Sequence, residues 1–270
     1  NISTQIEKLR DGKFNIKLSP DTNTKPGVYK IISTITVNGE EHTVESQFAW
    51  GLVSLNIKKS IYKPGETAEF VIVVLDSEGH PVGNADLSLA ITSPNNQITK
   101  ISSDNGIIYG SEIGLYDGQY DTSVEGTYKV AIHAIADGID TDFSTTFDVS
   151  TTYDYDIIRT AQSKIDPITN PNSFDVTIDI ESFVGGQDVT IVESVPAVFD
   201  VQTDAVVTQI GDKKILTWNK ELVDEKTEIS YSYSIPLVFP ELYALGPIEI
   251  HSGISTFTEA RNWFVAADPP

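Results

Sequence analysis

The fold is decided by residues 27–48, GVYKIISTITVNGEEHTVESQF, which align without a gap with residues 126–147, GTYKVAIHAIADGIDTDFSTTF. Each copy reads as a strand, a two-residue turn and a second strand, with turns at Asn38-Gly39 and Asp137-Gly138. Asn-Gly and Asp-Gly dipeptides between alternating strands are strong hairpin signals. We therefore predict that the two copies are the closing hairpins of two similar β-domains.

A second pair of segments lies upstream of the two hairpins and extends the match. Asp11-Gly12-Lys13-Phe14 precedes the first copy, and Asp117-Gly118-Gln119-Tyr120 precedes the second. Only ten residues precede Asp11, whereas most strands of the middle domain precede Asp117. Residues 1–50 are therefore expected to be the C-terminal part of an incomplete immunoglobulin-like domain. Either upstream sequence or another chain would complete it.

The rest of the chain divides into two regions of the size usual for an immunoglobulin-like sandwich, residues 51–150 and residues 151–270. In both regions, apolar Val, Ile, Phe and Tyr alternate with polar residues, which is the pattern of strands with one buried face. No window shows the apolar spacing of a helix longer than about two turns. The predicted fold class is all-β, with tandem immunoglobulin-like β-sandwich domains. The strands are expected at 54–58, 69–75, 86–92, 97–102, 174–180, 188–192, 214–218 and 228–234.

The charge and composition exclude several classes of partner. The chain of 270 residues has 18 Lys and Arg against 39 Asp and Glu, a net charge of −21, divided as 0, −9 and −12 among residues 1–49, 50–150 and 151–270. Such a field repels nucleic acid and anionic lipid and favours divalent cations. The longest apolar run, residues 70–75, is far short of the ~20 residues that cross a bilayer. The chain opens without Met, so we expect that it was cut from a longer protein.

The sequence has no recognisable catalytic signature. It has no cysteine, which excludes disulfides and thiol chemistry, and it contains no nucleophile elbow, zinc helix or phosphate-binding glycine loop. Its four histidines are scattered, at His42, His80, His133 and His251. We predict that the protein is not an enzyme. A pair of carboxylates at the spacing used in glycoside hydrolysis would be no evidence for that activity, because among 39 acidic residues some pair has this spacing by chance.

Calcium is the one cofactor that the sequence suggests, because it binds carboxylates and loop carbonyls. The first candidate site is Asp137, Asp140 and Asp142, where a turn brings alternating acids together. The second is Asp154 and Asp156, at the junction before the last domain. A solvated acidic face explains both groups equally well.

The aromatic residues have structural and functional interpretations. Trp218 is either a core residue or a platform for stacking sugars, and Trp263 is expected at a domain junction. Tyr231 and Tyr233 share one face of a strand, either as sheet packing or as part of an adhesive face. Arg261, between Glu259 and Trp263, predicts a structural ion pair under an aromatic cover.

Two resemblances to known families follow from particular segments. Residues 55–66, LNIKKSIYKPGE, followed by residues 70–76, FVIVVLD, resemble the opening of the second macroglobulin domain of α-macroglobulins. The inhibitory activity of that family needs a bait region and usually a cysteine thioester, and this chain has no cysteine. From Phe48 onward the chain also resembles large secreted proteins of archaea, those of ammonia oxidisers among them, and this implies a cell-surface location. The segments that carry this resemblance are residues 48–51, 62–66, 192–197, 230–233, 240–247 and 259–263.

Together these features predict a structural or adhesive segment of an extracellular cell-surface protein, in a surface layer or envelope array. Closed sandwiches in series, joined by short linkers such as Gly51-Leu52-Val53, would present a stiff acidic rod. Its partners would be other domains of the parent protein, neighbouring copies and divalent cations. The alternative is a non-catalytic accessory module of a secreted enzyme that binds polysaccharide or protein, which a line of exposed aromatics on one sheet would favour.

Overall fold

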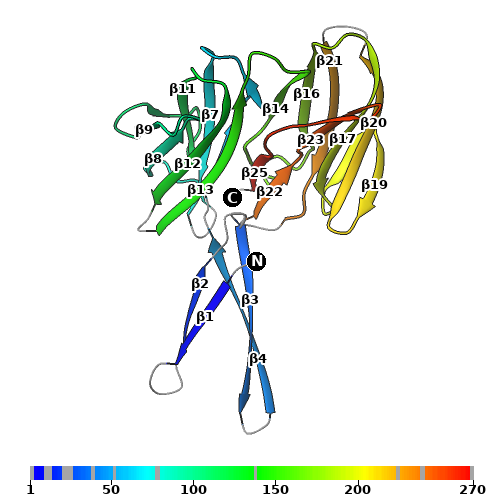
Figure 1. Cartoon of the computed structure of the whole chain (residues 1–270). Coiled ribbons are helices and arrows are strands. Elements are labelled where there is room, and N and C mark those ends of the chain that lie inside the picture. The colour runs from blue at the N-terminus through cyan, green and yellow to red at the C-terminus, as the bar shows by residue number, and fades with distance from the viewer. Residues whose placement is uncertain are drawn as a thin grey trace.

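The computed structural model describes residues 3–8, 14–19, 27–37, 40–50, 53–76, 80–136, 139–222, 226–237 and 241–267. Within these ranges every regular element is a strand, which confirms the all-β fold class. The same ranges contain no helix that is long and apolar enough to cross a membrane. The strands pair into several mainly antiparallel sheets (Figure 1).

The middle region, residues 53–149, is a sandwich of two sheets that enclose one apolar core. One sheet consists, in spatial order, of β10 (Ile107–Tyr109), β11 (Leu115–Asp121), β7 (Thr67–Val74) and β5 (Val53–Ile57). The other consists of β6 (Ile61–Tyr62), β13 (Ile139–Val149), β12 (Gly126–Ala136), β8 (Asp86–Thr92) and β9 (Ile98–Ser102). Alternate residues point inward, as the burial of every second residue of β8 shows. The largest fully buried side chains of the middle sandwich are Tyr62, Phe70, Tyr128 and Phe147.

The last region, residues 155–267, forms a second sandwich and one further sheet. Its first sheet consists of β14 (Tyr155–Ala161), β16 (Phe174–Ser182), β21 (Lys226–Ser234) and β18 (Asp200–Thr203). Its second consists of β19 (Val206–Ile210), β20 (Lys213–Leu222), β17 (Gln187–Pro196), β23 (Ile248–Ser252) and β24 (Ser255–Thr258). The further sheet has three strands, β15 (Lys164–Ile165), β25 (Trp263–Ala267) and β22 (Glu241–Leu245).

The repeated hairpins pair in the same register. In β12–β13, Gly126 lies opposite Val149, and in the hairpin of β3 (Gly27–Val37) and β4 (Glu40–Trp50), Gly27 lies opposite Trp50. The partner of the first glycine is 23 residues further along in both, so the gapless sequence match corresponds to equivalent backbone pairing. The prediction of two similar hairpins is confirmed. The turn dipeptides themselves lie outside the described residues.

The predicted extension of the repeat through Asp11 and Asp117 stays a prediction, because Asp11 and Gly12 lie outside the described residues. Asp117 and Gly118 lie inside β11, where they pair with Val71 and Phe70 of β7. In the first segment, β1 (Ser3–Lys8) pairs with β2 (Phe14–Ser19).

The first segment, residues 3–50, forms two separate two-stranded sheets, β1–β2 and β3–β4. Within the described residues neither sheet pairs with a strand of the two sandwiches. Ile32 of this segment is 61% exposed, and Ile35 and Val44 are exposed as well. A two-stranded ribbon is marginal without a cover. That residues 1–50 are part of an incomplete domain therefore stays a prediction.

The two sandwiches lie side by side, with β25 and β22 between them (Figure 1). All five residues of β25 are buried, and Ala266 packs with Val73 and Leu75 of the middle region. Trp263, Val265 and Ala267 belong to the core of the last sandwich, whereas Phe264 belongs to that of the middle one. The expected rod of sandwiches joined only by short linkers is therefore wrong for this pair, because a shared apolar sheet joins them.

Candidate functional site

Two residues of the first predicted calcium group, Asp140 and Asp142, lie near the start of β13. Asp140 and Asp142 are exposed, with 71% and 80% of their side chains open to solvent. They flank His133 of β12, whose Nδ1 lies 2.9 Å from Asp142 Oδ1 and whose Nε2 lies 3.9 Å from Asp140 Oδ1. Asp137 lies outside the described residues. The geometry is that of a histidine between two solvated carboxylates.

The second predicted group is divided between two environments. Asp154 is exposed, whereas Asp156 is 3% exposed on β14 and pairs with Lys59 at 3.1 Å. Lys59 also reaches Glu66 at 3.1 Å. Where the structure describes the chain, no three His, Asp or Glu side chains form a group that could hold a metal. Calcium binding at either site stays a prediction.

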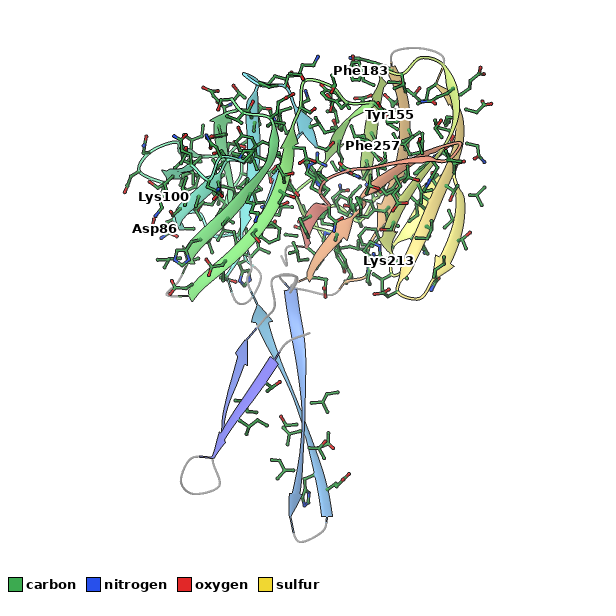
Figure 2. The ribbon with its side chains drawn as sticks, in the orientation of Figure 1. Asp86, Lys100, Tyr155, Phe183, Lys213 and Phe257 are labelled. Atoms are coloured by element: carbon green, nitrogen blue, oxygen red, sulfur yellow. The ribbon has the colours of Figure 1, made fainter. Side chains whose placement is uncertain are left out.

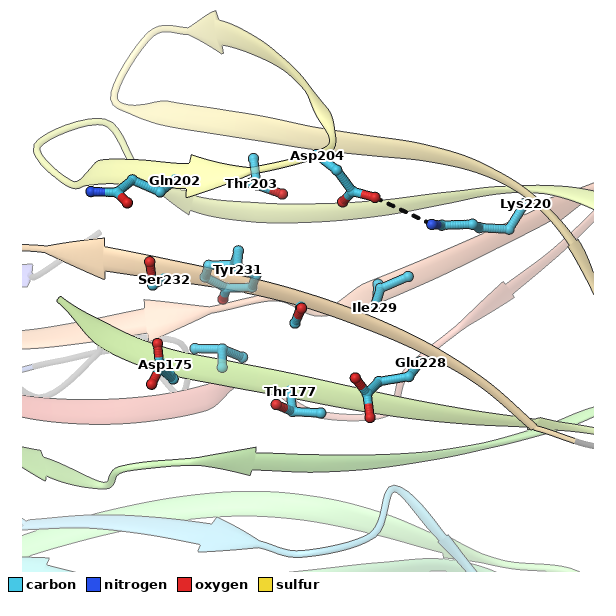
Figure 3. A pocket seen from close by; sticks show the side chains of 12 residues that line it. Asp175, Thr177, Gln202, Thr203, Asp204, Lys220, Glu228, Ile229, Tyr231 and Ser232 are labelled. Carbon is cyan, nitrogen blue, oxygen red and sulfur yellow. Dashed lines mark hydrogen bonds and ion pairs between the residues drawn. The ribbon is translucent and has the colours of Figure 1, made fainter.

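A polar hollow of about 490 Å³ lies on the outer face of the sheet formed by β16, β21 and β18 (Figure 3). Its lining includes Asp175, Thr177 and Glu228, and at one side Asp204 accepts hydrogen bonds from Trp218 Nε1 at 2.7 Å and Lys220 Nζ at 3.3 Å. The Trp218 bond, ahead of Lys220, lowers the pKa of Asp204. Tyr231 is the one aromatic residue of the lining, and it is 4% exposed. The hollow therefore offers hydroxyl and carboxylate groups but no exposed ring for a sugar to stack on.

A group of charged side chains joined by three ion pairs is buried at the junction of the two sandwiches. Arg159 of β14 contacts Glu193 of β17, with 2.5 Å between Nη1 and Oε1, and Glu259, with 3.2 Å between Nη2 and Oε2. Glu259 also pairs with Arg261, and Tyr231 donates to Glu193 Oε1 at 3.1 Å. All four charged side chains are at most 1% exposed. Two guanidinium groups thus balance two carboxylates in a site closed to solvent.

This junction cluster, defined as Arg159, Glu193, Tyr231, Glu259 and Arg261, is linked to the middle sandwich through backbone carbonyls. Arg261 donates from Nε to Ile57 O at 2.5 Å and from Nη2 to Lys58 O at 2.9 Å. Removing Arg261 would therefore break bonds in both sandwiches. The predicted ion pair of Arg261 with Glu259 is confirmed, and Trp263, expected at a domain junction, is 3% exposed in the core of the last sandwich.

Asn56 of β5 makes a second buried link. Its Nδ2 donates to Phe264 O at 2.7 Å, and its Oδ1 accepts from Phe264 N at 2.7 Å. The amide side chain therefore pairs with the backbone of β25 as a neighbouring strand would. Asn56 Nδ2 also donates to Ser163 Oγ at 2.9 Å. Buried backbone groups need such partners, so Asn56 allows β25 to enter the middle sandwich.

Gly246 shapes the edge of the junction cluster. Its φ of +80° lies in the left-handed region, which favours glycine. A Cβ atom at this position would lie 3.1 Å from Arg159 Nη2. Gly246 N also donates to Ser194 O at 2.9 Å, next to Glu193. A side chain at residue 246 would displace the guanidinium group that balances both glutamates.

The two glutamates of the junction cluster have opposite pKa shifts. Burial raises the pKa of Glu193, with Arg159 opposing it. Burial alone would also raise the pKa of Glu259, but Arg261 and then Arg159 outweigh it and hold that pKa below 4.5. The difference follows from the number of partners, because Glu259 contacts two guanidinium groups and Glu193 contacts one.

We expect Glu259 to make the junction acid-sensitive. A carboxyl group whose pKa is lower in the folded than in the unfolded state stabilises the fold at pH values above its unfolded-state pKa. This stabilisation is lost as the pH falls through its folded-state pKa. The difference in free energy of unfolding between the native chain and Glu259→Gln should therefore be largest at neutral pH and shrink below pH 4.5. Urea unfolding at a series of pH values measures it. A difference that stays constant down to pH 3 would contradict the assignment.

Comparisons with known proteins give no family for the chain. No protein-family model matches it, and neither does any curated protein sequence. Among solved structures it is similar to Escherichia coli alpha-2-macroglobulin activated by porcine elastase, at 9% identity and a TM-score of 0.34. It is also similar to Salmonella alpha-2-macroglobulin, in a mutant and in a form reacted with methylamine, at 15% identity and a TM-score of 0.31. The chain spans 26% of the former and 21% of the latter, so no residue role is carried over.

Proposed function

We propose that this chain is a non-catalytic structural segment of an extracellular surface protein, in which the two sandwiches act as one rigid unit. The observation that carries the proposal is β25, whose Trp263, Val265 and Ala267 lie in the core of the last sandwich and whose Phe264 lies in that of the middle one. Domains that move relative to one another usually meet through small, polar interfaces. Here the interface contains a buried strand, a paired amide and a balanced ionic cluster.

The charged residues of the junction cluster support a structural role over a catalytic one. A catalytic group must reach a substrate, and the side chains of Arg159, Glu193 and Glu259 are 0% exposed. Their hydrogen bonds and ion pairs are to one another, to Arg261, to the Tyr231 hydroxyl and to a backbone amide. The aromatic residues that would favour a binding module, Trp218, Tyr231 and Tyr233, are all core residues in the structure.

The extracellular location and the place in a surface array are part of the same proposal. They rest on the resemblance of the sequence segments described above and on the net charge of −21. Dense negative charge opposes contact between the acidic faces of neighbouring copies. Divalent cations would relieve that repulsion in an assembled layer.

Single-molecule pulling on the full chain tests the rigid unit. We expect one rupture event that releases both sandwiches together, because unfolding either one exposes Phe264 or the junction cluster. A chain that yields two well-separated events, each with the length of one sandwich, would contradict the proposal. Native-state hydrogen exchange gives an independent reading, since both sandwiches should share one global opening free energy.

A further inference from the structure

The β19 strand, Val206–Ile210, is an open edge of the last sandwich. It pairs with β20 on one side, and no described strand lies on its other side. All five of its residues are exposed, including Val206 at 65%, Val207 at 43% and Ile210 at 65%. The strand therefore presents both unpaired backbone groups and apolar side chains to solvent.

Edge strands in soluble proteins are usually protected by charges, proline or bulges. The β9 edge carries Lys100 and the β18 edge carries Asp200, but β19 reads Val-Val-Thr-Gln-Ile and has none of these features. An unprotected edge of this kind accepts an added strand, with main-chain hydrogen bonds supplying the affinity. Its occupant must therefore be another extended segment.

The charge around β19 favours a second copy of this chain as that occupant. Residues 151–270 carry a net charge of −12, yet the hairpin of residues 206–222 carries Lys213, Lys214 and Lys220 against Asp212 and Glu221. This hairpin is thus slightly basic within a strongly acidic region. Figure 2 shows Lys213 at one end of the last sandwich. A second copy can approach here without the repulsion that the acidic surface imposes elsewhere.

We propose that β19 pairs antiparallel with β19 of a second copy about a two-fold axis, joining two five-stranded sheets into one continuous sheet. Antiparallel pairing centred on Thr208 places Val206 of one strand beside Ile210 of the other, so apolar side chains meet at both ends. The Lys213 end of each strand then faces the Asp204 end of its partner. This inference rests on the proposed structural role and adds that the partner is a second copy of the chain.

Sedimentation velocity of the full chain across a concentration series tests the pairing. We expect a reversible monomer–dimer equilibrium in physiological salt. Lysines at both ends of the strand, in Val206→Lys/Ile210→Lys, should raise the dissociation constant at least roughly tenfold, because like charges then face each other directly. Both positions are 65% exposed, so the fold should be retained, and circular dichroism checks that.

The control is Ile98→Lys, which places one lysine on the β9 edge at a residue that is 60% exposed. Its dissociation constant should stay within about twofold of the native value. The pairing is refuted if the native chain remains monomeric at every concentration, if the double variant dimerises as well as the native chain, or if Ile98→Lys weakens the dimer equally. Pulling experiments use single molecules, so this inference and the rigid unit can fail separately.

Discussion

Replacing Arg159 by alanine is expected to lower the free energy of unfolding by about 3–5 kcal/mol, the cost of leaving a buried charge without its partner. Arg159 is the guanidinium group that contacts both Glu193 and Glu259, and all three side chains are 0% exposed. Without it, Glu259 keeps Arg261, but Glu193 keeps only the hydroxyl of Tyr231. Urea unfolding followed by tryptophan fluorescence measures the loss, since Trp218 and Trp263 lie in the adjoining core.

Two further variants separate the charge effect from lost packing. Arg159→Met/Glu193→Leu removes both charges and keeps apolar volume, so it should recover a large part of the loss. Lys58→Ala breaks an ion pair with Glu69 whose side chains are 52% and 42% exposed, so it should cost within about 0.5 kcal/mol. If the double variant is as unstable as Arg159→Ala, unpaired charge is not the cause.

The sequence was sufficient for the fold class because strands leave local signals. Alternation of apolar and polar residues placed β8 at residues 86–92, where the structure has it, and the gapless repeat fixed the register of two hairpins. Both signals lie within a few residues of the structure that they predict.

The junction cluster had no such signal. Arg159 meets Glu193 and Glu259, which are 34 and 100 residues away along the chain. With 39 acidic residues available, nothing local indicated which would be buried beside which arginine. Arg261 and Glu259 were predictable as a pair because they are two residues apart. The hydrogen bonds from Arg261 to Ile57 O and Lys58 O depend on how the sandwiches pack, which one sequence does not reveal.

The run of apolar residues in β25 does indicate from the sequence that this strand is buried on both faces. Residues 263–267, WFVAA, do not alternate with polar residues, and a short continuous apolar run indicates a strand buried on both faces. A strand at the end of a sandwich with one open face would instead alternate. The apolar run therefore indicates that a second layer packs on the other face of β25, and in the structure that layer is the middle sandwich.

Phe264→Ala is expected to lower the free energy of unfolding by about 3–5 kcal/mol, the usual cost of emptying a buried aromatic site. Phe264 is 7% exposed and packs edge-on against Phe143 of β13, with 5.0 Å between ring centroids. The cavity would open in the middle sandwich although residue 264 belongs to a strand of the last region. Hydrogen exchange should therefore show lost protection in β12 and β13 as well as in β25.

Phe257→Ala is the matched control, because Phe257 packs against the core of the last sandwich alone and is only partly buried. It should cost about 1–2 kcal/mol, since a partly exposed ring loses less buried area. If the two sandwiches share one cooperative unit, Phe264→Ala should lower the protection of β17 and β20 by the same free energy as that of β12. Lost protection confined to the last sandwich would mean that β25 packs on the middle sandwich without stabilising it, and the shared core would no longer explain a rigid unit.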